Sequence, residues 1–379
     1  MSFDIEKFVI IDNHAHSILK DLAVLDEIGF RQCFSESRCL NILQDHVNKS
    51  VHYMSMLDHL LRIFGLKSEQ EFLAFRMKQD SAQFVQMLWD NVSLGALVID
   101  DGYNSGHAMN LEQLSKISGR PIFLCRRMEA IMESSILSAE SFKEVLSNYK
   151  KHLLSSSKRK PVALKTICGY RGGLSLLDPT EKEAERDFDK IKKSLGETKT
   201  FRIEKSPLYH FLLRKSFEYA GQAELPVQIH SGIGDDDADL VECNPALMQP
   251  LFRDRRYSKT RFVLLHCYPY VREAAFMCSL YSNVFMDLSL SISLASPSSA
   301  MLIHEALSTA PSTKLLAGTD GHSCPESHWF GALNWKRGLS HALFEMINSG
   351  LVTQKEAEEI GALVLHDNAI KLYKLEGLA

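Results

Sequence analysis

The chain has 379 residues, of which 45% are hydrophobic and 24% are charged, as is ordinary for a soluble globular protein. Its 43 Lys and Arg stand against 47 Asp and Glu, so the formal net charge is −4 with the 15 His counted as neutral. This balance excludes collagen-like and wholly disordered proteins. It offers no basic excess for a nucleic-acid partner, and no apolar run approaches the roughly 20 residues of a membrane span.

The N-terminal sequence and the cysteines bear on the cellular compartment. Residues 1–6 lack the basic head and apolar stretch of a signal peptide. The eight cysteines are scattered, with no Cys-x-x-Cys pair, which is typical of reduced thiols inside the cell. We therefore expect a cytoplasmic protein that binds a small-molecule substrate and has neither a membrane nor a nucleic-acid partner. A homo-oligomer is compatible with the sequence.

Short apolar runs rich in Val, Ile and Leu recur along the chain and are typical of strands buried on both faces of a parallel sheet. They lie at 8–12, 96–100, 121–125, 162–166, 226–230, 261–266, 284–288 and 314–318. Stretches with helical spacing separate them, among them 111–117, 139–154 and 208–220. This alternation predicts an α/β protein with a (β/α)₈ TIM-like barrel. A doubly wound sheet, which shows the same alternation, is the rival architecture.

The connection after the first strand is unusually long. From about residue 18 to about residue 94 the apolar residues have helical spacing and no strand is evident. We expect a helical insertion folded over the barrel mouth, within a single barrel domain that spans 1–379. A separate N-terminal domain is less favoured, because the first strand precedes this segment. The Met and Phe stripe of the insertion could line a pocket, but burial preference favours a core role.

Side chains of the kind that bind metals follow several of the predicted strands. His14 and His16 end the first strand, and strand alternation puts both imidazoles on one face. Further candidates lie at or just beyond other strand ends, namely Lys165, His230, His266 and Asp320. Active sites of (β/α)₈ enzymes are built at this face of the barrel. We therefore expect these side chains to converge there.

The chemistry of this set suits a catalytic metal. Zinc-like ions prefer imidazole and carboxylate when no thiolate is offered. The set therefore predicts one or two divalent ions, with Zn²⁺ favoured and Mn²⁺ or Fe²⁺ as alternatives. A carboxylate beside a water on such an ion can take a proton and later return it to a leaving amine. Asp320, within the segment 316–321, is placed for that role.

At these residues the sequence resembles the amidohydrolase superfamily. That pattern is His-x-His after strand one, Lys or another bridging ligand after strand four, His after strands five and six, and Asp after strand eight. Segments 163–174, 228–240, 262–266 and 319–326 are more specifically similar to the amidohydrolase domain of fluG-like proteins. The resemblance runs from about residue 8 to 375 and implies a metal-dependent amidohydrolase. It implies metal ligation by His14, His16, Lys165, His230, His266 and Asp320, with catalytic roles for Asp320, His266 and Lys165.

Lys165 and two of the histidines have alternative interpretations. Lys165 could be carboxylated and bridge two metal ions, as in some members of the superfamily, or its amine could contact substrate. It could equally belong to a structural ion pair, because a lysine is rarely buried without a partner. His230 and His266 could be satisfied core histidines, but their places on successive strand ends favour metal or substrate contact.

Charged and polar side chains near the expected mouth are candidates for substrate binding. Arg171, after the fourth strand, offers a planar fork that matches a carboxylate, although it could bond loop carbonyls instead. Arg127 and Glu129 follow the third strand and could pair with each other or touch substrate, and His322 follows the eighth strand as a pocket residue. The acidic loop 235–239 could bind an ammonium group or a second cation, but turn and helix-cap roles are favoured for most of its aspartates.

The sequence thus predicts a hydrolase that cleaves the amide C–N bond of a small carboxylate-bearing substrate. The fluG-like resemblance, rather than the spacing of residues, suggests a γ-glutamyl amide. A non-oxidative decarboxylase or a uronate-isomerase-like enzyme on the same scaffold is the nearest alternative. A non-catalytic scaffold that retains a metal is a further alternative.

Overall fold

The computed structural model describes the whole chain except residues 1–4, 104–105, 156–158, 196–199, 376 and 379. Eight parallel strands form one sheet in which each strand is hydrogen-bonded to the next along the chain. The strands are β1 (Ile10–Ala15), β2 (Leu94–Asp100), β3 (Ile122–Arg127), β4 (Ala163–Thr166), β5 (Val227–Ser231), β6 (Phe262–His266), β7 (Val284–Asp287) and β8 (Leu315–Leu316). The sequential order confirms the predicted (β/α)₈ barrel and excludes a doubly wound sheet, whose strand order is not sequential.

Backbone hydrogen bonds between the segment after β8 and the end of β1 bring the two edges of the sheet together. The Asn13 N–H donates to the Ala317 carbonyl at 2.9 Å, and the Asp320 N–H donates to the His14 carbonyl at 2.9 Å. β8 is shorter than expected because the Ala317 N–H donates instead to the carbonyl of Val364 in a C-terminal helical turn. These bonds hold Asp320 directly beside the end of β1.

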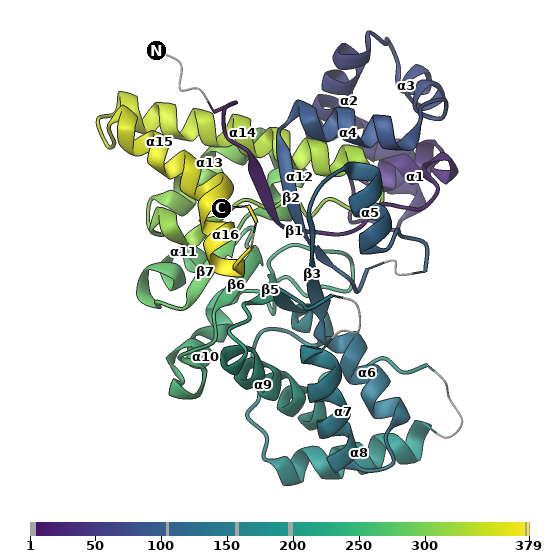
Figure 1. Ribbon diagram of the computed structural model, residues 1–379, viewed down its shortest axis with the longest axis vertical. Coiled ribbons are helices and arrows are strands. Elements are labelled where there is room, and N and C mark those ends of the chain that lie inside the picture. Colours follow the sequence, from purple (N-terminus) through teal and green to yellow (C-terminus); the bar gives the residue numbers. More distant parts are fainter. Residues whose placement is uncertain (1–4, 104–105, 156–158, 196–199, 376, 379) are drawn as a thin grey trace.

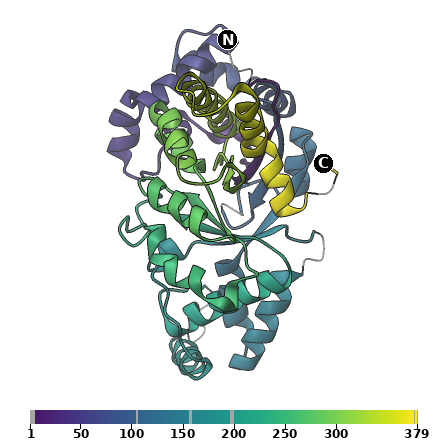
Figure 2. The same ribbon diagram turned by 90° about the vertical axis from the view of Figure 1, so that its left-hand side faces the viewer.

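Helices cover the strands and occupy both ends of the molecule. They are α1 (Glu27–Gln32), α2 (Val51–Phe64), α3 (Glu69–Arg76), α4 (Ser81–Asn91), α5 (Leu111–Ser118), α6 (Met128–Ser138), α7 (Phe142–Leu154), α8 (Glu181–Leu195), α9 (Pro207–Gln222), α10 (Gln249–Arg253), α11 (Val271–Leu280), α12 (Ser289–Leu294), α13 (Ser299–Leu307), α14 (Pro325–Asn348), α15 (Gln354–Ala362) and α16 (Asn368–Tyr373). Figure 1 shows α1–α4 gathered at one end and α6–α9 at the other. In Figure 2 the green-to-yellow C-terminal helices lie in front of the strands. No helix in the described part of the chain combines the length and apolar character needed to cross a membrane.

The helical insertion predicted after the first strand is confirmed, because α1–α4 fill the connection from β1 to β2. Part of its apolar stripe belongs to the core, since Leu60, Phe72 and Phe84 are buried. The methionines of the stripe, Met54, Met77 and Met87, are exposed instead. The loop that follows α1, in contrast, reaches the barrel mouth. The insertion therefore has two parts, a packed helical layer and a loop that faces the site.

A buried ion pair joins the insertion to the helix that follows the last strand. Arg76 of α3 donates to Glu326 of α14 at 2.5 Å, and the two side chains are only 2% and 0% exposed. Arg76 also donates to the Leu22 carbonyl at 2.6 Å. Glu326 lies just beyond the loop that carries Asp320. The ion pair therefore connects the insertion to the segment that holds this candidate ligand.

We predict that Arg76→Ala lowers the free energy of unfolding by about 3–5 kcal/mol, because it leaves the Glu326 carboxylate buried without a counter-charge. Denaturant unfolding at pH 7 measures the loss. Arg62→Ala is the matched control, since its pair with Asp58 is 72% and 52% exposed and should contribute about 0–1 kcal/mol. Equal effects from the two substitutions would show that the buried pair does not hold the insertion in place.

Candidate active site

A cavity of about 590 Å³ opens at the carboxyl ends of the strands. Among the side chains predicted from the sequence, those lining it are His14, His16, Lys165, His230, His266, Asp320, Arg127, Arg171 and His322. The insertion contributes a further part of the wall through Cys33, Glu36 and Arg38. The cavity is therefore enclosed partly by the barrel and partly by the loop that follows α1.

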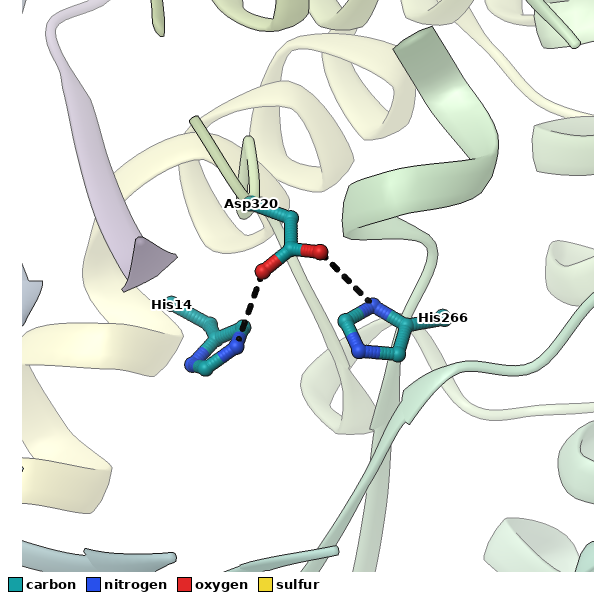
Figure 3. Close-up of side chains that lie close together, drawn as sticks. All are labelled: His14, His266 and Asp320. Atoms are coloured by element: carbon teal, nitrogen blue, oxygen red, sulfur yellow. Dashed lines mark ion pairs between the residues drawn. The ribbon is translucent and has the colours of Figure 1, made fainter. Parts of the chain in front are cut away.

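Asp320 lies at the centre of the imidazoles. Figure 3 shows its carboxylate between the rings of His14 and His266. Asp320 Oδ1 is 3.0 Å from His14 Nε2 and 3.3 Å from His16 Nε2, and Oδ2 is 3.9 Å from His266 Nδ1. Two sets of potential ligand atoms each lie within 4.8 Å of one another: those of His14, His266 and Asp320, and those of His14, His16 and Asp100.

The protonation states favour binding of a cation. Burial lowers the pKa of His14 to about 4 and holds the pKa of His266 well below its usual value. Both rings are therefore neutral at pH 7 and retain a lone pair. Burial alone would raise the pKa of Asp320, but the surrounding imidazoles, His266 first, hold it well below the usual range. An ionised carboxylate among neutral imidazoles is a suitable ligand set for a divalent metal.

A neighbouring amide fixes which nitrogen of His14 faces Asp320. Gln228 Nε2 donates to the Asn13 carbonyl at 2.6 Å and to Tyr373 Oη at 3.0 Å. Gln228 Oε1 is thus the acceptor for His14 Nδ1 at 2.9 Å, so the His14 Nε2 lone pair points toward Asp320 Oδ1. Two acceptor atoms this close repel each other unless a positive charge lies nearby, such as a metal ion or the Lys165 ammonium group, whose Nζ is 3.2 Å from His14 Nε2. The residues present therefore fit a metal ion.

Buried polar atoms without a hydrogen-bond partner also occur on the neighbouring histidine rings. His16 Nδ1, His230 Nε2 and Asp320 Oδ1 are buried and have no hydrogen-bond partner among the described residues. Buried polar atoms are normally satisfied, and three unpartnered atoms gathered around one cavity are consistent with an ion or a ligand there. The His230 ring lies 4.5 Å from that of His266 and 4.3 Å from that of Tyr170, centroid to centroid. His230 is thus part of the same cluster.

Lys165 is buried below the cluster, with Nζ 3.2 Å from His14 Nε2. Burial lowers the pKa of this ammonium group. No carboxylate of the described residues lies within 4.0 Å of Nζ, so the structural ion pair considered from the sequence finds no partner. The remaining interpretations of Lys165 are a carboxylated metal bridge and an amine that contacts substrate.

The backbone at two of the candidate ligands is strained. His266 has φ +66° and Asp320 has φ +52°, in the left-handed region that non-glycine residues seldom adopt. Asp287 Oδ1 accepts from the His266 N–H at 2.8 Å. Asp12 accepts from the Thr319 N–H at 2.9 Å and from Thr319 Oγ1 at 2.5 Å. These buried carboxylates hold the strained segments in place.

The structure corrects the expectation for Arg127 and Glu129. They do not pair with each other, because Arg127 forms its ion pair with Asp100, with Nε 2.9 Å from Oδ2. Glu129 Oε1 accepts from Thr166 Oγ1 at 2.6 Å and from Tyr209 Oη at 2.8 Å. Glu129 is buried and does not line the cavity, so the structure gives its predicted contact with substrate no support. Arg127 lines the cavity as predicted.

Arg171 and His322 both face the cavity. Arg171 Nη2 is 3.5 Å from Glu133 Oε1, and its buried Nε has no hydrogen-bond partner among the described residues. The guanidinium therefore has capacity for a further anion. His322 contacts Ser323 Oγ at 3.1 Å and lies 5.4 Å from the ring of Tyr103. Burial lowers the pKa of His322 to about 4.

The acidic loop is used for turn and surface contacts. Asp239 Oδ1 accepts from the Val241 N–H at 2.9 Å, as expected for a capping aspartate. Asp235 and Asp236 pair with Arg38 of the insertion at 2.8 and 3.5 Å, and Asp237 pairs with Arg202 at 3.0 Å. Ion pairs thus join the acidic loop to the insertion. Because its carboxylates already have partners, they are not free to bind another cation.

Several site residues were not predicted from the sequence. Asp100 and Asp287 end β2 and β7, so the strand-end rule that found Asp320 could have found them. The amide of Gln228 orients His14 from within β5, where an amide resembles any other buried polar residue. Glu36 and Tyr103 come from connections whose path only the fold reveals.

Comparison with known proteins agrees with this geometry. Residues 184–375, just over half of the chain, match the family model described as amidohydrolase. The chain belongs to the amidohydrolase family. It is 27% identical over 406 aligned positions to Protein fluG of Emericella nidulans, a match covering 98% of this chain and 46% of that protein. The chain thus spans about half the length of this curated relative.

Solved structures share the fold of this amidohydrolase. A Lactobacillus casei protein provisionally named a metal-dependent hydrolase superposes with a TM-score of 0.88 at 24% identity, covering 98% of this chain and 96% of the other. Glucuronate isomerase from Caulobacter crescentus superposes with a TM-score of 0.68 at 17% identity, covering 98% and 92%. At these identities the likeness shows the fold alone, while the reaction must be argued from the site.

Proposed function

We propose that this amidohydrolase cleaves the amide C–N bond of a small carboxylate-bearing substrate, with γ-glutamyl amides as the first class to test. The observation that carries the proposal is the Asp320 carboxylate, surrounded by imidazoles and open to a cavity that Arg171 also lines. The similarity to fluG supports the choice of γ-glutamyl amides.

His14, His16, His266 and Asp320 would hold a divalent cation, with zinc the first choice for imidazole and carboxylate ligands. Such a cation supplies Lewis-acid polarisation of the scissile carbonyl and activation of water. Asp320 takes a proton from water in the cavity and returns it to the departing amine. Arg171 binds the substrate carboxylate, which positions the amide over Asp320.

Product analysis tests the proposal against its rivals. The purified protein is assayed for bound metal and screened for amine release across γ-glutamyl amides and N-acyl amino acids. Released amine supports hydrolysis. Released carbon dioxide from a carboxylic acid, or isomerisation of a uronate without either product, would overturn it in favour of another reaction on the same barrel. Bound metal without turnover of any of these compounds would favour the non-catalytic scaffold.

We predict that Arg171→Ala raises KM by about tenfold or more for the amide found in that screen, because a charge-assisted contact of roughly 1.5–3 kcal/mol is lost. Arg171→Lys should recover only part of the loss, since an ammonium group cannot reproduce the guanidinium fork. Steady-state kinetics provide the measurement, with Arg186→Ala on the exposed face of α8 as the control. If Arg171→Ala leaves KM unchanged, Arg171 has a structural role in its loop and does not bind substrate.

A further inference from the structure

One carboxylate in the cavity has no partner. Glu36 lies on the loop between α1 and α2 and lines the cavity together with the imidazole cluster. It is half-buried, yet it forms no hydrogen bond and no ion pair with the described residues. Among the other acids of the cavity wall, Asp235 pairs with Arg38 and Asp237 with Arg202, while Asp320 belongs to a candidate metal-ligand set.

The surroundings of Glu36 are negative and aromatic. Burial raises the pKa of Glu36 to about 8, and the charges of Asp320 and Asp235 add to this effect, while the charge of Arg38 on the same loop opposes it. Burial raises the pKa of Tyr103 to about 12, with Glu36 as the next cause, and Glu36 likewise follows burial in raising the pKa of Tyr170. The Tyr103 ring lies 4.9 Å from the His16 ring, and the Tyr170 ring lies 4.3 Å from the His230 ring, centroid to centroid. Glu36 thus lies within electrostatic reach of two aromatic rings that contact the cluster.

This environment is complementary to an organic cation. An ionised Glu36 without an ion-pair partner is unfavourable in this partly desolvated cavity, which is why its pKa is raised to about 8. An arriving cation stabilises the ionised form. Aromatic faces attract ammonium groups through their quadrupole. The candidate metal-ligand sets of the described residues do not include Glu36, which sets it apart from the cluster at Asp320. The cavity therefore offers a cation subsite at Glu36 as well as an anion subsite at Arg171.

We propose that Glu36 binds a protonated amino group of the substrate, so that the enzyme selects zwitterionic, amino-acid-like amides. This inference rests on the proposed function, because it assigns the substrate of the same cavity. It makes Glu36 a specificity-determining residue supplied by the insertion. A substrate that carries a carboxylate and an ammonium group would then be held at both ends, with its amide presented to the cluster.

Ligand binding tests the subsite without relying on turnover. Calorimetry on the metal-loaded protein compares L-glutamate with glutarate, which has both carboxylates but no amino group. The wild type should bind L-glutamate more tightly by about tenfold or more, the usual scale of a charge-assisted contact. Glu36→Gln has the same shape without the charge and should abolish this preference. Glu185→Gln, on an exposed position of α8, is the matched control and should retain it.

The outcomes separate this inference from the proposed function. Equal binding of the two acids by the wild type would show that no group in the cavity distinguishes the amino group. A preference that survives in Glu36→Gln would show that the metal or another group binds it. Either result overturns the assignment of Glu36. Hydrolysis of γ-glutamyl-p-nitroanilide and of glutaryl-p-nitroanilide is measured in parallel. Cleavage of both at equal rates by the wild type would overturn the inference alone. An ammonium preference that depends on Glu36, without cleavage of either amide, would support the subsite and refute the hydrolytic function.

Discussion

Asp320→Asn should lower kcat by about 10² or more, the usual scale of general acid–base catalysis. The Asn side chain keeps the shape and one acceptor oxygen but cannot take a proton at neutral pH. Asn also tolerates the left-handed backbone found at φ +52°, so the variant should fold without new strain. Turnover and bound metal are measured on the same preparation, so that lost metal is not mistaken for lost proton transfer.

The pH dependence gives a second readout of the same substitution. The imidazoles hold the pKa of Asp320 well below its usual range, so its carboxylate is ionised at neutral pH. The wild-type enzyme should therefore lose the proton acceptor only as the pH falls through that low pKa. The acid limb of the kcat profile should therefore change in Asp320→Asn. Asp189→Asn, exposed on α8, is the control. Turnover near that of the wild type with full metal occupancy would refute the hydrolytic mechanism.

Replacing His14 and His16 together with Ala should strip the protein of its divalent metal. The double substitution removes two neutral imidazoles that lie 3.0 and 3.3 Å from Asp320, and one carboxylate with His266 cannot complete a tetrahedral site. Elemental analysis of the purified protein measures metal per chain, and activity should disappear with the metal.

The control for this prediction removes two imidazoles outside the cavity. His46 and His341 are exposed, and the double variant His46→Ala/His341→Ala should keep its metal. Thermal unfolding establishes that both double variants are folded, which matters because His14 is bonded to Gln228 in the barrel interior. Unchanged metal content in a folded His14→Ala/His16→Ala protein would mean that the metal site lies elsewhere.

The architecture was predictable because barrel strands leave a strong local signal. Each strand is buried on both faces and is therefore a short run of apolar, often β-branched residues, and all eight runs read from the sequence coincide with observed strands. The polar residues that interrupt these runs, such as His14 and Lys165, are costly to bury without partners. That cost is why they stand out as site residues in the sequence alone.

The fine geometry of the site was not predictable, because it depends on contacts between residues far apart in the chain. The left-handed backbones of His266 and Asp320 are accompanied by long-range hydrogen bonds, from the His266 N–H to Asp287 and from the Thr319 N–H to Asp12. Likewise, Arg127 and Glu129 are near in sequence but find separate partners, since Asp100 lies at the end of the neighbouring strand and Tyr209 on α9.

The sequence by itself determined the barrel, the place of the insertion and the identity of the strand-end cluster, since these follow from local periodicity and the parallel order of strands. Only the tertiary structure decided which further side chains join the strand-end cluster in lining the cavity. The helices of the insertion pack into the core, and its loop brings Glu36 over the cluster, beyond the reach of any local pattern. Long-range packing leaves that carboxylate without an ion pair among the described residues, because Arg38 on the same loop pairs with Asp235 and Asp236 instead.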